Sequence, residues 1–158
     1  MANRDGDGWV SCRCGSRHWG LNGAAGLVLY RDGSAGPEVL LQHRAGWVHD
    51  GGTWAVPGGA RDSHEDPVAA ALREANEEVG VEADHVQVSE TLTGTDHADW
   101  RYDYVLAHAG PEARFHAAND ETAGLSWVPV TGAPSLPLHA GLARDWERLS
   151  ERLRDVMG

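Results

Sequence analysis

One stretch, residues 59–81, constrains the fold and the chemistry of this 158-residue chain more than any other. Within it, residues 69–79 are rich in Ala, Leu, Arg and Glu and contain no Gly or Pro, so they predict a helix. Pro67 suits the first turn of that helix, because proline lacks an N–H that would be unpaired there in any case. Gly80 follows the last turn, where a C-cap glycine is favoured. The sequence therefore predicts a helix bounded by these two residues.

Three carboxylates lie on one face of the predicted helix. Glu74, Glu77 and Glu78 are three and four positions apart, and a helix of 3.6 residues per turn places them on the same side. Like charges at this spacing destabilise a helix by roughly a few tenths of a kcal/mol each, and Arg73 cannot neutralise all three. A divalent cation bound between the carboxylates would compensate, and Mg²⁺ held in this way usually also binds substrate phosphates. A solvated acidic face is the alternative, and the residues alone leave both open.

The charged residues and glycines of this stretch follow the pattern Gly59-x5-Glu65-x7-Arg73-Glu74-Ala75-x-Glu77-Glu78-x-Gly80-Val81. This pattern resembles the Nudix box, the signature of the Nudix hydrolases, and is far more specific than a lone glycine motif. Ala75 is the one departure, because the family usually has a larger aliphatic residue there, and it puts local helix packing in question rather than metal binding. Residues 54–59, Trp-Ala-Val-Pro-Gly-Gly, resemble the usual lead into the box. The resemblance spans about residues 23–129.

The resemblance implies an α/β fold, an α/β/α sandwich with a mixed sheet, with the box as a loop, helix and loop at its edge. It implies that Glu74, Glu77 and Glu78, together with Gly59, hold the divalent cations, Mg²⁺ first and Mn²⁺ as the second candidate. Arg73 is expected to pair with a box glutamate and fix its orientation. The implied reaction is attack of water on a phosphorus of a nucleoside diphosphate linked to another moiety.

The identity of the general base is open in this family. A box glutamate is favoured, with Glu78 or Glu77 ahead of the others. Glu121 is a second candidate, because relatives often place an acidic residue facing the site from this region; it can equally be an exposed loop acid. Glu65 is expected to be structural or an accessory metal ligand.

For the remainder of the chain, the sequence predicts short strands and a second helix. Residues 141–157 have apolar side chains three and four positions apart, which is typical of an amphipathic helix. We expect residues 1–20 to form an irregular N-terminal lead-in with room for a short hairpin, and residues 21–158 to form a single Nudix domain. Strands are predicted at residues 24–30, 39–43, 53–56, 86–95, 101–107 and 125–129.

The charge and hydropathy of the chain limit the classes of partner that it is expected to bind. The chain has 13 Lys+Arg against 24 Asp+Glu, a formal charge of -11, which disfavours binding to a long polyanion. Apolar runs are too short to span a membrane, and the N-terminal region lacks a basic-then-apolar signal pattern. We therefore expect a cytoplasmic protein that binds a small nucleotide substrate, rather than a nucleic-acid polymer or a membrane. A homodimer is left open.

A second group of residues could bind a metal. Cys12, Cys14 and His18 offer three zinc-type ligands, but a structural zinc site usually has four, often as C-x2-C pairs, and no second pair follows. The expectation favoured here is a structural turn without a metal, with metal binding left open. The two cysteines are too close in sequence for an unstrained disulfide.

Aromatic residues supply the candidates for substrate binding, although no substrate-binding residue is fixed by the sequence. Trp47, Trp54 and Trp100 could each stack on a nucleobase, whereas large aromatics more often fill core space. We expect one of them at most to be a base platform. His49 and His97 lie in predicted loops that could border the substrate.

The leading function is hydrolysis of a pyrophosphate linkage by a Nudix enzyme, with (d)NTP pyrophosphohydrolases slightly favoured over other substrate classes by elimination. The alternative is a catalytically silent module that senses a nucleotide or metabolite. The intact set of box carboxylates favours the enzyme. A third possibility is an acidic binding protein whose glutamate-rich helix is only solvated.

Overall fold

A computed structural model of the chain describes residues 5–47, 51–94 and 97–157. A seven-stranded mixed sheet forms its centre, with strand order β5-β4-β3-β8-β7, while β6 pairs with β3 and β9 pairs with β4. The strands of this sheet are β3 (Ala24–Gly33), β4 (Gly36–Arg44), β5 (Trp54–Ala55), β6 (Gly58–Ala60), β7 (Val86–Thr93), β8 (Tyr102–Ala109) and β9 (Thr122–Pro129). The pairing of β3 with β8 is parallel and the other pairings are antiparallel.

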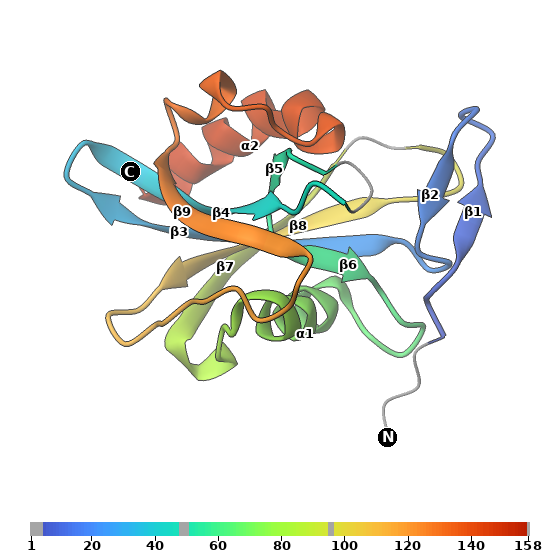
Figure 1. The fold of residues 1–158 in the computed structure, drawn as a ribbon, viewed down its shortest axis with the longest axis horizontal. Coiled ribbons are helices and arrows are strands. Elements are labelled where there is room, and N and C mark those ends of the chain that lie inside the picture. Colours follow the sequence, from blue (N-terminus) through green and yellow to red (C-terminus); the bar gives the residue numbers. More distant parts are fainter. Residues whose placement is uncertain (1–4, 48–50, 95–96, 158) are drawn as a thin grey trace.

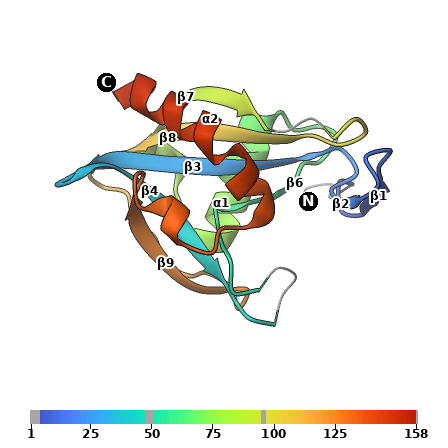
Figure 2. The same ribbon diagram turned by 90° about the horizontal axis from the view of Figure 1, so that it is seen from above.

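The two α-helices cover opposite faces of the sheet (Figures 1 and 2). Helix α1 (Pro67–Val79) packs on one face and α2 (Ala140–Met157) on the other. Two short 3₁₀ turns, Ala83–His85 and Ala133–Ser135, precede β7 and α2. The predicted α/β/α sandwich with a mixed sheet is therefore confirmed.

Each helix packs on one face of the sheet, and a separate hydrophobic core lies beneath each helix. Under α1, the small residues Ala70, Ala71 and Ala75 are fully buried against the strand residues Leu27 and Val105. Because alanines keep the helix close to the sheet, the alanine at position 75 is accommodated by tight packing. Under α2, a larger core forms from the residues Val28, Leu41, Leu106, Trp146, Leu149 and Leu153, among others.

Most predicted elements are confirmed, with differences at glycines. The antiparallel pairs β3–β4 and β7–β8 occur as expected, as do both helices. The strands predicted at residues 24–30 and 39–43 are longer in the structure, continuing to Gly33 and beginning at Gly36. The strand predicted at residues 53–56 is limited to Trp54–Ala55, and Gly58–Ala60 forms β6, which was not predicted and pairs with β3. Thr95, at the end of a predicted strand, lies outside the described residues.

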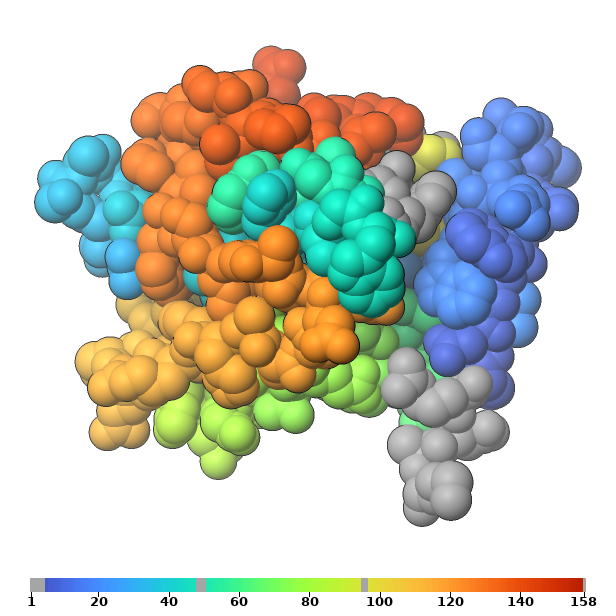
Figure 3. Space-filling model, in the orientation of Figure 1, coloured from blue at the N-terminus to red at the C-terminus, as the bar shows by residue number. Residues whose placement is uncertain are grey.

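The N-terminal segment forms a separate two-stranded hairpin. Strands β1 (Trp9–Ser11) and β2 (Arg17–Trp19) pair antiparallel. In the space-filling view this hairpin is a lobe at one end of the molecule (Figure 3). Neither α1 nor α2 combines the length and apolar character needed to cross a membrane, in the part of the chain that the structure describes.

Candidate active site

The ends of α1 fix where the box carboxylates lie. The Asp66 carboxylate accepts a hydrogen bond of 2.7 Å from the N–H of Ala69, which caps the first turn. Gly80 adopts a left-handed conformation with φ of 73°, and its N–H donates to the carbonyl of Asn76. Pro67 lies in the first turn and Gly80 follows the last, as predicted, and the Asp66 cap adds to them. The apolar side of α1 packs on the sheet, so its acidic residues lie beside β6.

Arg73 organises the carboxylates around it. Its Nε and Nη2 donate to the two Glu65 carboxylate oxygens at 2.8 and 2.9 Å, a bidentate pair. Its Nη1 donates to Glu74 at 2.8 Å and lies 3.5 Å from Glu77. The remaining Nη2 hydrogen bond goes to the carbonyl of Ala60 in β6, at 3.0 Å. With 18% of its side chain exposed, Arg73 is a partly buried clamp that ties the helix to the strand.

The glycines of β6 allow two box carboxylates to approach the strand. A Cβ atom at Gly59 would lie 2.6 Å from the carboxylate carbon of Glu74, so only glycine leaves room for that side chain. The N–H of Gly58 donates to Glu78 at 2.9 Å. Both carboxylates therefore reach β6 from one side of α1.

The charge of this cluster is only partly compensated. Burial, and then the neighbouring charge of Glu74, raises the pKa of Glu78 to about 8, although hydrogen bonds from Gln42 and Gly58 oppose the shift. The pKa of Glu65 is lowered, mainly by its hydrogen bonds from Arg73. Arg73 thus shares its single positive charge between Glu65 and Glu74, whereas Glu78 remains in an environment that disfavours its own negative charge.

This donor set fits a divalent cation. Carboxylate oxygens are the ligands that Mg²⁺ and Mn²⁺ prefer, and an added positive charge would relieve the repulsion between Glu74 and Glu78. Glu77, with 43% of its side chain exposed, leaves the cluster open towards solvent. Glu74, Glu77 and Glu78 are the residues that would hold the ion.

Residues outside the box also contact its carboxylates and the glycines of β6. Gln42, buried in β4, donates to Glu78 at 3.3 Å and accepts a hydrogen bond from Thr122 of β9. The hydroxyl oxygen of Tyr102 would lie 2.5 Å from a Cβ atom at Gly58, so it also borders the β6 glycines. None of these residues was predicted from the sequence. The one available signal was the polar Gln42 within an otherwise apolar strand segment.

Glu121, the second candidate for the general base, contacts the end of β4 through its backbone. Glu121 is exposed, and its carbonyl accepts a hydrogen bond of 2.8 Å from the N–H of Ala45. Its carbonyl therefore ties the start of β9 to the end of β4.

The three tryptophan candidates also differ in exposure. His43 stacks on Trp54 with ring centres 4.5 Å apart, and His18 stacks on Trp100 at the same separation. Trp47 is 69% exposed, just after β4. His97 lies beside the N-terminal hairpin, and His49 is outside the described residues.

Comparison with known proteins places this site in a family. The model of the NUDIX domain matches residues 20–149, which include the whole box. The chain belongs to the Nudix hydrolases. The structural fold of this Nudix enzyme agrees with the match: a crystal structure of a Nudix hydrolase from M. smegmatis, RenU, superimposes with a TM-score of 0.86 and 44% identity, covering 96% of this chain and 97% of that one.

Two curated relatives extend the comparison. A protein of Mycobacterium tuberculosis named putative 8-oxo-dGTP diphosphatase 3 is 48% identical over 92% of this Nudix chain and 69% of its own length. A nucleoside triphosphate pyrophosphatase/Nudix hydrolase fusion protein of Bifidobacterium longum is 39% identical over 98% of this chain, which spans 33% of that protein.

Proposed function

We propose that this Nudix hydrolase cleaves a phosphoanhydride bond of a nucleoside triphosphate in a Mg²⁺-dependent reaction, with deoxynucleotides, including oxidised dGTP, as the favoured substrates. The observation that carries the proposal is the Arg73 clamp, which orients Glu74 while Glu78 is held on the β6 backbone. The name of the M. tuberculosis relative supports the substrate class.

The chain's own residues would bind, orient and accept a proton. A bound Mg²⁺ supplies charge that screens the phosphates and lowers the pKa of a water. Glu74 is fixed by Arg73, so it would hold its ligand oxygens in one place. Glu78 is fixed through Gly58 and Gln42, and Glu77 faces solvent. Glu77 or Glu78 would accept the proton of the attacking water.

The base of the nucleotide is proposed to contact Trp47. This side chain is the most exposed of the candidate tryptophans and lies three residues after β4, the strand that also carries Gln42. An exposed indole face can stack on any nucleobase, with a contribution of about 1–3 kcal/mol per base. Trp54 and Trp100 already stack on histidine rings.

The experiment that tests this function is phosphate and pyrophosphate release from a panel of (d)NTPs, 8-oxo-dGTP, ADP-ribose, NADH, nucleotide sugars and diadenosine polyphosphates. Each is assayed with Mg²⁺, with Mn²⁺ and with a chelator. Metal-dependent turnover that is fastest for (d)NTPs or 8-oxo-dGTP is expected. Fastest turnover of another class would refute the substrate assignment, and nucleotide binding without any turnover would replace the enzyme by a sensing module.

A further inference from the structure

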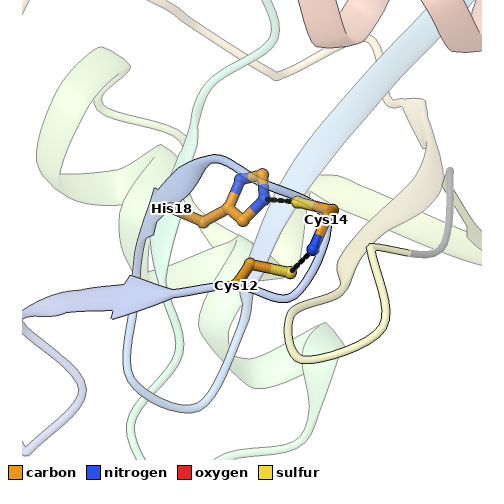
Figure 4. A group of neighbouring side chains, drawn as sticks. All are labelled: Cys12, Cys14 and His18. Atoms are coloured by element: carbon orange, nitrogen blue, oxygen red, sulfur yellow. Dashed lines mark hydrogen bonds between the residues drawn. The ribbon is translucent and has the colours of Figure 1, made fainter.

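The N-terminal hairpin brings three soft metal ligands together, far from the box in sequence. The ligand atoms of Cys12, Cys14 and His18 all lie within 4.8 Å of one another. Cys14 Sγ is 3.1 Å from His18 Nε2, and the N–H of Cys14 donates to Cys12 Sγ at 3.4 Å. Figure 4 shows the three side chains pointing towards one another at the end of the hairpin.

The architecture of the hairpin accounts for this convergence. His18 is paired with Val10 across the two strands, and side chains alternate along a strand, so Cys12 and His18 project from the same face. A tight turn then returns the chain, with Gly15 at φ of 95° and its N–H bonded to the carbonyl of Cys12 at 3.0 Å. This turn places Cys14 beside His18, although only one residue separates the cysteines.

The separations are close to those of a tetrahedral zinc site. Zn–S bonds of about 2.3 Å and Zn–N bonds of about 2.0–2.1 Å require ligand atoms roughly 3.5–3.8 Å apart. The observed separations, from 3.1 Å to less than 4.8 Å, bracket this range. The three ligand atoms are therefore already within about 1 Å of the separations that zinc requires.

The ligand side chains are also held from outside the hairpin. The His18 ring stacks on Trp100 with ring centres 4.5 Å apart, and the tilted His97 ring lies 4.4 Å from it. The Cys12 thiol donates to the carbonyl of His97, a hydrogen bond that is given up when the thiol loses its proton to bind a metal. Orientation of a histidine ligand by its neighbours is a common property of metal sites.

We propose that Cys12, Cys14 and His18 bind one Zn²⁺ ion, with water as the fourth ligand. Thiolate and imidazole ligands select zinc over Mg²⁺, so this site is chemically distinct from the carboxylate site of the box. His97 is not assigned as the fourth ligand, because its Nε2 faces a guanidinium nitrogen of Arg144 at 3.3 Å.

The proposed ion would link the two ends of the hairpin turn, and the hairpin already contacts the loop before β8. Two contacts already join these segments: Arg13 to Asp99, with Nε to carboxylate at 2.9 Å, and the Trp100 indole N–H to the carbonyl of Trp19 at 3.2 Å. Binding releases the two thiol protons as the sulfurs become thiolates. The proposal takes up the metal binding that the sequence left open, in place of the favoured turn without a metal.

The test is a Co²⁺ titration of the full-length protein, reduced, stripped of metal and held in excess Mg²⁺ to saturate the box. The expected result is a thiolate-to-cobalt charge-transfer band and tetrahedral d–d bands that saturate at one equivalent and are bleached by Zn²⁺. The Cys12→Ser/Cys14→Ser variant should lose the charge-transfer band entirely, and His18→Ala should weaken the binding. Absence of the band in the reduced wild-type protein would overturn the proposal.

Matched variants separate this site from its surroundings. Glu77→Gln/Glu78→Gln should keep the cobalt band, because the box contains no sulfur ligand. His97→Ala should also keep it, and loss of the band in that variant would overturn the three-ligand assignment. Circular dichroism checks that each variant is folded, and nucleotide turnover by Cys12→Ser/Cys14→Ser should equal that of the wild type. A failure of this proposal leaves the function of the box unaffected.

Discussion

The box and the N-terminal hairpin both gather metal-type ligands, but they do so by opposite means. In the box, ligands on one helix are held in place by a partly buried arginine and by strand glycines, and the ligands are hard oxygens. In the hairpin, the ligands come from a turn and a strand, the cysteines are partly or fully exposed, and the His18 ring stacks on Trp100. The difference indicates that the box is integrated into the core, whereas the hairpin depends on local contacts.

The largest effect should follow removal of the clamp. Arg73→Ala leaves Glu65 and Glu74 without their main counter-charge, so we expect a loss of about 3–5 kcal/mol in the free energy of unfolding. Arg73→Lys should recover only part of it, because lysine cannot form the bidentate pair. Urea denaturation monitored by tryptophan fluorescence measures both. Equal stability of Arg73→Ala and wild type would show that the ion pairs of Arg73 with Glu65 and Glu74 do not stabilise the fold.

Charge removal within the box should act on turnover rather than on the fold. Glu77→Gln and Glu78→Gln keep the side-chain shape but remove the charge, and each should lower kcat by roughly a hundredfold or more. Glu151→Gln, an exposed position on α2, is the matched control. Steady-state kinetics with Mg²⁺ gives the comparison. Wild-type turnover in both box variants would refute the assignment of the site.

A single methyl group at Gly59 should disturb the box from the strand side. Gly59→Ala places a Cβ atom against the Glu74 carboxylate, so Glu74 must move and activity should fall about tenfold, the effect of roughly 1.4 kcal/mol. Gly124→Ala is the control, because nothing lies within 4 Å of a Cβ atom there. Kinetics at several Mg²⁺ concentrations should show a raised metal requirement only for the first variant. An unchanged requirement would mean that Glu74 can relax freely.

Metal binding at the hairpin should give a smaller and more local gain. Zn²⁺ should raise the Tm of the wild type by on the order of 3 °C, because a ligand that binds only the folded hairpin stabilises it. Cys12→Ser/Cys14→Ser should show no such rise. Differential scanning calorimetry with and without Zn²⁺ measures the shift, and an equal shift in the double variant would place the ion elsewhere.

The smallest effect is expected at the surface pair of the hairpin. Arg13, with 78% of its side chain exposed, pairs with Asp99, and water screens such an exposed pair. Arg13→Ala should therefore change the free energy of unfolding less than either of the Arg73 variants above. Urea denaturation is the measurement. A larger loss would mean that the hairpin is more strongly coupled to the core than its exposure indicates.

The same contrast explains what could be predicted from the sequence. Helix periodicity and capping residues suffice to predict that Glu74, Glu77 and Glu78 share one face, since those features are local. The role of Gln42 could not be predicted, because it depends on which face of β4 meets α1. Strand β6 was missed because its glycines carry no side-chain pattern, and their reason is the approach of Glu74 from another element.

In the hairpin, by contrast, the local sequence pattern was not sufficient to predict that the three ligand-type residues lie together. The spacing of Cys12, Cys14 and His18 departs from the usual zinc patterns, so the sequence favoured a turn without a metal. Their convergence depends on strand pairing and on Trp100, which is distant in the sequence. Strand pairing and the turn between the strands, rather than the ligand spacing alone, thus decide whether three ligand-type residues lie together.

Electron paramagnetic resonance of Mn²⁺ binding tests most directly the central claim that the box carboxylates hold a divalent cation. Wild-type protein and Cys12→Ser/Cys14→Ser should bind Mn²⁺ equally and release it to Mg²⁺, whereas Glu74→Gln/Glu78→Gln should lose binding together with turnover. Equal Mn²⁺ binding by the glutamate variant and the wild type would contradict the claim, because the ion would then be held by residues outside the box.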